Sequence, residues 1–342
     1  MTAPTDKAAI ERHLNTGLLD TWHPVLPSWA LGSEAVGLTR LARQIVIWRD
    51  GAGRVHALED RCPHRGARLA LGWNLGDRLA CWYHGVQVRA DGAIADVPAV
   101  ADCPMTTKAR VRAYPAREHA GAVFVYFGLD PAAPPVPLDL PEPLTSDAFG
   151  HRLCVAHWKC NYRYAIDNVM DPMHGSYLHA ASHSMAEGDK SAEMRLRTTP
   201  RGFVFEKTTQ RDVNFDWVEF GESGCLWLTL EIPYQKRHGP GGPFGIVGFA
   251  TPVDEANTLV FFWRTRKVQG WQRDVWRFLY GNRLEGLHWE VLEQDRQMLE
   301  NLAPGARERE FLYQHDVGLA RVRRHLLARA AAEVAALAEA AK

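Results

Sequence analysis

Short runs rich in β-branched and aromatic residues recur along the first third of the chain. They are separated by turns that contain Gly or Asp, which is typical of antiparallel strands. We expect strands at residues 43–48, 54–58, 86–88 and 122–127. The pattern therefore predicts an all-β domain between about residues 20 and 130.

A proline-rich segment follows this β-rich part. Residues 131–143 contain six prolines in thirteen positions. Proline fixes φ and lacks an N–H donor, so the segment is incompatible with a helix interior or a central strand and should act as a semi-rigid spacer. We therefore predict a domain over 1–130, with an N-terminal extension over 1–20, then the linker 131–143 and a second domain over 144–342.

The second domain combines strand-like runs with longer segments of helical spacing, which predicts an α+β protein. Between two of the strands lies a Gly- and Pro-rich stretch that we expect to be a mobile loop. The expected elements are strands at 202–206, 225–232 and 258–265, a long helix over about 270–302, a terminal helix over 318–342 and the loop at 239–245.

Composition narrows the class of protein. The chain has 342 residues, 46% of them hydrophobic, and a formal net charge of zero, so nothing favours nucleic acid or an anionic membrane surface as a partner. The start of the chain lacks the apolar core of a signal peptide, and no apolar run approaches the roughly 20 residues of a membrane span. We expect a cytoplasmic protein. It has no GxGxxG fingerprint, so a nicotinamide or flavin site is not expected either.

The six cysteines divide into two groups. Cys62 and Cys81 each have a histidine at short spacing, and the others do not. In a chain of this length the six do not suggest a disulfide scaffold, and metal ligation is the more natural use of the first pair. The remaining four are expected to be small buried hydrophobes: Cys103, Cys154, Cys160 and Cys225.

Two loops combine a thiolate with an imidazole. They read Cys62-Pro-His64-Arg-Gly and Cys81-Trp-Tyr-His84-Gly, with Pro and Gly supplying tight turns. A zinc knuckle of unusual order is one interpretation. The mixed order suits better a site in which both cysteines hold one iron and both histidines the other, as in a Rieske [2Fe–2S] cluster. The two loops resemble the cluster loops of ring-hydroxylating oxygenases, and Pro98 falls where that family has a third loop over the cluster.

A second group of candidate ligands lies between residues 167 and 179. His174 and His179 are five residues apart, so a regular helix would turn them about 140° away from each other. Both can reach one metal only if the helix widens or breaks between them. Pro172 already disrupts the preceding turn. A His pair alone is weak support for a metal site, and two histidines leave a metal under-ligated.

The long predicted helix offers a third ligand. Asp295 lies within an apolar stripe on one helix face, where an ionised carboxylate is costly unless it meets a cation or full hydrogen bonding. A salt bridge to a buried arginine is the alternative. His288 lies on the same stripe and is a competing ligand, although a supporting or core position suits it better. The stripe consists of Leu284, Leu287, Val291, Leu292, Met298, Leu299 and Leu302.

Two histidines and one carboxylate form the facial triad of non-haem Fe(II) oxygenases. The order Asn-x2-Asp-x2-His-x4-His, together with Glu-Gln-Asp-Arg around Asp295, resembles the mononuclear iron motif of Rieske non-haem iron oxygenases. The resemblance covers both domains. It implies a helix-grip catalytic domain, Fe(II) on His174, His179 and Asp295, and functional roles for Asn168 and Asp171.

The resemblance also implies partners. In that family the residue matching Asp171 hydrogen-bonds a Rieske histidine, here His84 of the partner subunit, and an iron-ligating histidine of its own subunit. The chain length resembles the homotrimers of the dicamba and vanillate O-demethylase type. A separate NAD(P)H-dependent reductase, with or without a ferredoxin, would supply electrons for O2-dependent hydroxylation or demethylation of a small aromatic substrate.

Two other functions remain open at this point: a Rieske electron-transfer or redox-sensing protein, and a helix-grip ligand-binding protein with a structural zinc. If the chain is an oxygenase, we expect its pocket walls to come from residues 180–187, the runs near 203, 228 and 246–262, and the long helix. Three arginines could bind a substrate carboxylate, but exposed positions at strand ends are the more common case: Arg201, Arg264 and Arg266.

Overall fold

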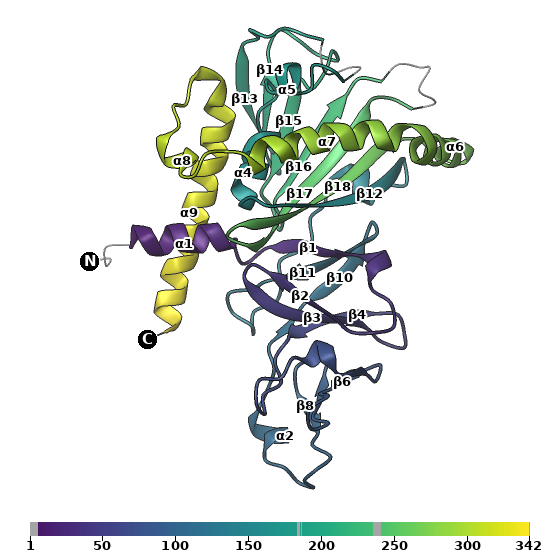
Figure 1. The fold of residues 1–342 in the computed structure, drawn as a ribbon, viewed down its shortest axis with the longest axis vertical. Helices are drawn as coiled ribbons and strands as arrows, with labels where there is room; N and C mark the ends of the chain where they lie inside the picture. The colour runs from purple at the N-terminus through teal and green to yellow at the C-terminus, as the bar shows by residue number, and fades with distance from the viewer. Residues whose placement is uncertain (1–5, 183–184, 186, 235–240, 342) are drawn as a thin grey trace.

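The structure, a computed structural model, describes residues 6–182, 185, 187–234 and 241–341. Its N-terminal part contains three antiparallel sheets, whose strand orders are β1-β11-β10, β2-β3-β4-β9 and β5-β6-β7-β8 (Figure 1). The strands are β1 (Trp22–Pro27), β2 (Val36–Arg40), β3 (Arg43–Arg49), β4 (Val55–Glu59), β5 (Trp73–Asn74), β6 (Arg78–Ala80), β7 (Gln87–Arg89), β8 (Ile94–Asp96), β9 (Ala113–Tyr114), β10 (Ala116–His119) and β11 (Ala122–Tyr126).

Strand β3 shows how the alternation along the sequence builds this part. Ile45 and Ile47 pack into the core shared with β1 and β11, whereas Val46 and Trp48 pack into the core beneath the sheet β5–β8. Successive side chains of a strand point to opposite faces, so one apolar strand joins two cores. All four side chains are fully buried.

The C-terminal part is built on a seven-stranded antiparallel sheet in the order β12-β18-β17-β16-β15-β14-β13. Helix α7 crosses one face of this sheet in Figure 1. The strands are β12 (Phe149–Trp158), β13 (Met194–Thr199), β14 (Gly202–Lys207), β15 (Trp217–Gly221), β16 (Trp227–Ile232), β17 (Phe244–Asp254) and β18 (Asn257–Lys267). The helices of the chain are α1 (Lys7–Thr16), α2 (Met105–Lys108), α3 (Glu142–Thr145), α4 (Tyr162–Val169), α5 (Gly175–Leu178), α6 (Trp271–Leu279), α7 (Glu285–Glu300), α8 (Ala306–Arg309) and α9 (Val317–Ala340), with 3-10 turns at Ser28–Ala30, Leu69–Leu71 and Gln314–Asp316 and a π-helix at Tyr280–Leu284.

Both faces of β18 are buried, against different partners. Val260 and Phe262 pack with Leu292 and Leu299 of α7. Phe261 and the residues that alternate with it pack instead against the N-terminal sheet that contains β1 and β11. This apolar contact joins the two parts of the chain and leaves only the α7 face available for a cavity.

The proline-rich linker runs as predicted without strand structure, and its end is helical. Helix α3 begins at Glu142 and includes Pro143 in its first turn, where a missing N–H costs no hydrogen bond. The segment is also fastened to the N-terminal part, since Trp22 Nε1 donates to the carbonyl of Val136 at 2.7 Å. The domain boundaries themselves stay a prediction.

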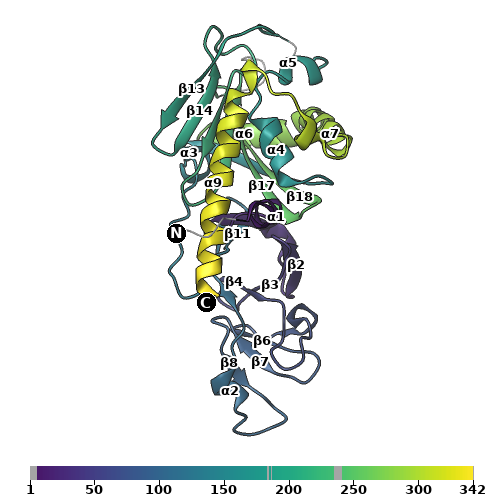
Figure 2. The same ribbon diagram turned by 90° about the vertical axis from the view of Figure 1, so that its left-hand side faces the viewer.

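The N-terminal extension packs against the C-terminal part of the chain. Ile10 and Leu14 of α1 lie in the core of the C-terminal sheet, and His13 contacts Glu333 of α9 at 2.7 Å. Helix α9 runs from that core past α1 in both views (Figures 1 and 2). The apolar face of α1 is thus covered by α9 and the core of the C-terminal sheet, and the assignment of residues 1–20 to the N-terminal domain stays a prediction.

The remaining predicted elements are mostly found. The expected strands correspond to β3, β4, β7, β11, β14, β16 and β18, and the expected terminal helix is α9. The long helix exists as α6, the π-helix and α7. Of the predicted loop 239–245, residues 239 and 240 lie outside the described residues and 244–245 begin β17. Cys103 is half-buried, so only three of the four unassigned cysteines are core residues. Within the part described, no helix has both the length and the apolar character that a membrane crossing needs.

Candidate metal centres and substrate cavity

Two equivalent loops bring the four predicted cluster ligands together. The N–H of Gly66 donates to the carbonyl of Cys62 at 2.9 Å, and the N–H of Gly85 donates to that of Cys81 at 2.8 Å. Both glycines have positive φ, 75° and 72°, which a residue with a Cβ adopts only with strain. The repeated turn places each cysteine beside its histidine.

The cysteines and histidines of these loops differ in exposure. Cys62 and Cys81 are buried, at 2% and 1% exposure, whereas His64 and His84 are exposed. The two imidazole rings lie 4.7 Å apart, centre to centre. An inner thiolate pair and an outer imidazole pair fit a two-iron cluster, with one pair on each iron.

Electrostatics also favour a cation between the thiols. Burial raises the pKa of Cys62 to about 11, and Cys81 beside it adds to the effect. At neutral pH the buried Cys62 is therefore a thiolate only if a metal compensates its charge. Pro98 packs over this site, since a Cβ on Gly85 would lie 3.3 Å from Pro98 Cγ. The predicted covering position of Pro98 agrees with this contact.

The second candidate site forms where the chain between α4 and α5 is interrupted. Helix α4 ends at Val169 and α5 is a single turn, Gly175–Leu178. The helix is therefore interrupted before His174 and ends again at His179, rather than widening or breaking between the two histidines as expected. His174 and His179 flank α5 as its N-cap and C-cap. The break turns both imidazoles toward α7.

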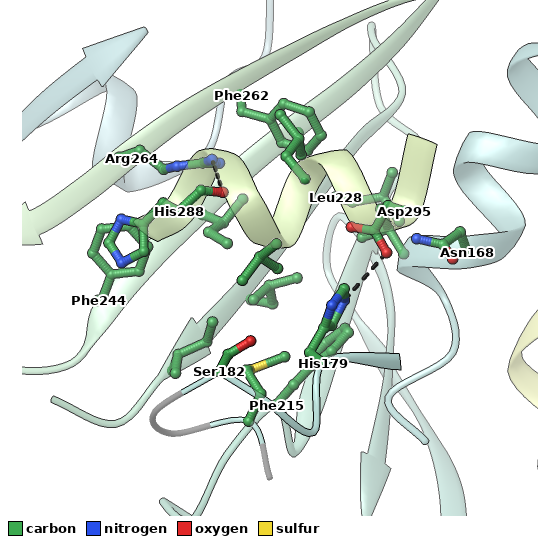
Figure 3. A pocket seen from close by; sticks show the side chains of 18 of the residues that line it. Asn168, His179, Ser182, Phe215, Leu228, Phe244, Phe262, Arg264, His288 and Asp295 are labelled. Carbon is green, nitrogen blue, oxygen red and sulfur yellow. Dashed lines mark hydrogen bonds and ion pairs between the residues drawn. The ribbon is translucent and has the colours of Figure 1, made fainter. Parts of the chain in front are cut away.

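Helix α7 supplies the third predicted ligand at this point. Asp295 Oδ1 lies 3.2 Å from His179 Nε2 and 3.6 Å from His174 Nε2. Candidate ligand atoms of the three residues all lie within 4.8 Å of one another. Figure 3 shows Asp295 and His179 facing each other across this space. Asp295 Oδ1 is buried and makes no hydrogen bond within the described part of the chain, as expected for an oxygen that awaits a cation.

The other nitrogen of each imidazole is occupied. His174 Nδ1 contacts the carbonyl of Asp171, and His179 Nδ1 contacts Gln294 Oε1 at 2.8 Å. Both acceptors lack a proton, so each Nδ1 carries the hydrogen and each Nε2 presents a lone pair. The sequence alone gave no role to Gln294, although it precedes Asp295 in the Glu-Gln-Asp-Arg segment.

The charge balance of this site favours a bound cation. Burial alone would lower the pKa of His179, but Asp295 and the bond to Gln294 together raise it above its ordinary value. One carboxylate oxygen and two imidazole Nε2 atoms meet in this buried place, and the raised pKa of His179 shows that the Asp295 carboxylate favours a positive charge here. Such a donor set fits Fe(II) with open coordination positions.

Asp171 and Asn168 lie beside this centre in different ways. The carboxylate of Asp171 is half-buried and accepts from the N–H of Met173 at 2.8 Å. It makes no contact with either histidine among the described residues, whereas the backbone carbonyl of Asp171 contacts His174 Nδ1. The bridging role of the carboxylate stays a prediction. Asn168 lines the cavity next to Asp295 (Figure 3).

An apolar cavity opens directly from the three converging side chains and runs along α7. Figure 3 shows it between α7 and the sheet. Its apolar walls include Phe215, Leu228, Phe244, Phe262 and Leu292, and the 180–187 segment contributes Ser182 and Met185.

Several expectations for this region were wrong. Phe203 faces the core under α9 rather than the cavity, because it alternates onto that side of β14. Leu287, Met298 and Leu302 are exposed by 45%, 49% and 38%, so the buried line on α7 is narrower than the apolar stripe. It contains His288, Leu292, Asp295 and Leu299.

The structure also places the four other candidate residues of the catalytic domain. His288 is buried beside Phe244 and Tyr280, away from the three converging ligands, so it is a core histidine and no competitor for the metal. Arg201 is partly exposed and pairs with Asp139 at 3.3 Å, as expected of a strand-end arginine. Arg264 and Arg266 are buried to 2% and 1% exposure, contrary to that expectation.

Comparisons with known proteins agree with both candidate centres. Residues 21–115 match the Rieske [2Fe–2S] domain, and residues 158–332, just over half of the chain, match the vanillate O-demethylase oxygenase C-terminal domain. The vanillate O-demethylase oxygenase subunit of a Pseudomonas species is 39% identical over 150 residues, which is 43% of this chain and 44% of that protein. The aligned part thus spans less than half the length of this relative.

Solved structures show the same fold over nearly the whole chain. The terminal oxygenase of carbazole 1,9a-dioxygenase from Nocardioides aromaticivorans superimposes with a TM-score of 0.76 at 20% identity, covering 95% of this chain and 98% of that one. Dicamba monooxygenase superimposes with a TM-score of 0.70 at 19% identity, covering 92% and 98%. With a Rieske domain and a catalytic domain of the vanillate O-demethylase type on one chain, this protein belongs to the Rieske non-haem iron oxygenases.

Proposed function

We propose that the chain is the terminal oxygenase component of a system that hydroxylates or oxidatively demethylates a small aromatic compound. One observation carries the proposal: the three ligands His174, His179 and Asp295 converge at the wall of a buried apolar cavity. A metal that serves only structure does not need such a cavity at its open side.

The protein's own residues would position the reactants. Cys62, His64, Cys81 and His84 would hold the cluster, and the triad would hold Fe(II). The two groups supply one-electron transfer and O2 activation when bound. The apolar walls place a flat substrate beside the triad and exclude water from the reacting carbon.

Electrons would come from a separate NAD(P)H-dependent reductase, directly or through a ferredoxin. The related carbazole 1,9a-dioxygenase oxygenase has been solved in complex with a ferredoxin. Here the cluster loops carry exposed aromatic side chains, Trp82 at 65% and Tyr83 at 56%, which suit a docking surface. We place this reaction in the cytoplasm, where NAD(P)H is available.

We also propose a homotrimer in which the cluster of one subunit serves the iron of the next. Within one chain the sheet β5–β8 lies at the opposite end of the molecule from α5 and α7 (Figures 1 and 2). Aromatic side chains are exposed at both ends, among them Trp73 near the cluster loops and Tyr177 and Tyr313 near Asp171. A head-to-tail contact would cover both and bring His84 of the partner subunit to the Asp171 carboxylate.

Spectroscopy of the purified protein tests the proposal against its two alternatives. We expect Rieske absorption, a reduced-state EPR signal, additional mononuclear iron and substrate-dependent O2 uptake in the presence of a reductase. A cluster without mononuclear iron would indicate an electron-transfer or redox-sensing protein. A colourless, zinc-loaded protein would indicate a ligand-binding module and reject the proposal.

A further inference from the structure

The cavity beside the triad has a second polar end. At one end lie His179 and Asp295, and at the other, across the apolar walls, Figure 3 shows Arg264 and His288. His288 and Asp295 are seven residues apart on α7, which separates them by about 10 Å along the helix axis. A substrate that fills this space would meet the triad at one end and a guanidinium at the other.

Arg264 reaches the cavity from β18. Arg264 and Phe262 are two residues apart on this strand and therefore share the sheet face that looks toward α7. The guanidinium lies 5.3 Å above the Phe262 ring. Nε donates to Tyr280 Oη at 3.2 Å, and Nη2 donates weakly to the carbonyl of His288 at 3.5 Å.

The charge of Arg264 has no anionic partner in the part of the chain that the structure describes. The two acceptors of its hydrogen bonds, a phenol and a backbone carbonyl, are neutral. Glu285, at the start of α7, pairs with Arg152 at 2.7 Å instead. A guanidinium that is 2% exposed is costly to bury without a counter-charge. A substrate anion at this end of the cavity would supply the missing counter-charge.

The surroundings add to the positive potential at this end. Arg266, the next residue on the same face of β18, is buried over the Tyr234 ring at 4.9 Å. Tyr234 Oη in turn contacts His288 Nε2 at 3.2 Å. Two buried guanidinium groups and two hydroxyl-bearing rings favour a planar oxyanion over a neutral group.

We infer that Arg264 is the anchor for the carboxylate of the substrate, and that the substrate class is therefore aromatic monocarboxylic acids whose reacting group lies on the far side of the ring. The inference rests on the proposed function, since it assumes that the substrate reacts at the end of the cavity where the triad lies. The planar guanidinium fork matches a carboxylate in two parallel hydrogen bonds, and the apolar walls accept the ring.

The competing explanation is that Arg264 only supports the fold by holding Tyr280 in the π-helix. That role would affect every ligand of the cavity equally. An anchor for a carboxylate would affect acids and spare their neutral analogues. The acid-to-amide ratio of affinities therefore separates the two roles, even where a variant lowers stability.

The experiment uses the holoenzyme loaded with cluster and Fe(II), kept anaerobic so that no turnover occurs. Calorimetry measures binding of 3-methoxybenzoate and 4-methoxybenzoate, each against its amide. The variants are Arg264→Gln, Arg264→Lys and, as a matched control on an exposed strand-end arginine, Arg201→Gln. Substrate-dependent O2 uptake with a reductase is measured separately.

We expect the native protein and Arg201→Gln to prefer at least one acid over its amide. Arg264→Gln should weaken binding of that acid by about 10-fold or more, the usual loss for a hydrogen bond to a charged group, and leave the amide within about threefold. Arg264→Lys should restore part of the preference, because it keeps the charge without the fork.

Equal losses for acid and amide in Arg264→Gln, or no preference for either acid in the native protein, would overturn the inference. Binding with the expected ratio but without O2 uptake would leave the carboxylate anchor standing and reject the oxygenase function instead.

Discussion

Gln294 offers a test of how the triad is held together. Its Oε1 accepts the Nδ1 hydrogen of His179 at 2.8 Å, and His179 is only 1% exposed. In Gln294→Leu this buried N–H would lose its acceptor, at a cost of about 1–3 kcal/mol. Because 1.4 kcal/mol corresponds to a factor of ten in an equilibrium constant, iron affinity should fall by between about 5-fold and 150-fold.

The assay is the mononuclear iron content after equilibration with buffered Fe(II), with the Rieske absorption as an internal reference for intact protein. Gln297→Leu is the matched control, since Gln297 lies on the exposed side of the same helix and its side chain donates to Glu293 Oε1, away from the three converging residues. Gln294→Glu keeps an acceptor and should retain iron. If the iron affinity of Gln294→Leu is within about twofold of that of the native protein, the bond from His179 to Gln294 does not fix the tautomer of His179, and the reasoning is refuted.

Three further changes have defined outcomes. Asp295→Ala removes one of the three converging ligands and should abolish mononuclear iron and turnover while the cluster spectrum persists; surviving turnover would mean that the third ligand is misassigned. Asp171→Asn keeps the acceptor for the Met173 N–H but lowers the charge, so both metals should stay and turnover should be lost; normal turnover would reject the bridging role. His23 is buried against the Leu18 carbonyl, and burial lowers its pKa to about 4. The unfolded chain binds that proton near pH 6.5, so stability is present above this pH and is lost as pH falls toward 4. Between pH 7 and pH 5 the native protein should lose about 2 kcal/mol more than His23→Gln in urea unfolding, and identical losses would contradict the assignment.

The linear order of residues carried most of the information on the two metal centres. The cluster loops are local motifs in which ligand and turn residues stand within five positions, so their geometry follows from the turn alone. The interrupted helix around Pro172 was likewise predictable, because the proline ring disrupts the turn that precedes it. Asp295 was found from the cost of placing a carboxylate on an apolar helix face.

Tertiary packing decided what local patterns could not. Helix α1 belongs with α9 because their apolar faces meet across more than 300 residues of sequence, as the contact of His13 with Glu333 shows. Leu287 and Met298 look like core residues in the sequence, yet the sheet covers a narrower strip of α7 than its apolar stripe. An amphipathic pattern indicates which face of a helix is apolar. The width of the buried strip on that face depends on the shape of the element that packs against it.

The residues around the cavity divide in the same way. The proposed metal ligands follow from residue type and spacing, which the sequence by itself determined. The burial of Arg264 depends on α7 closing over β18, and the acceptor on His179 depends on where Gln294 falls when α7 meets α5. Such contacts join elements that are distant in the chain, and their free energies are set by which surfaces meet in the folded protein. Only the tertiary structure could decide them.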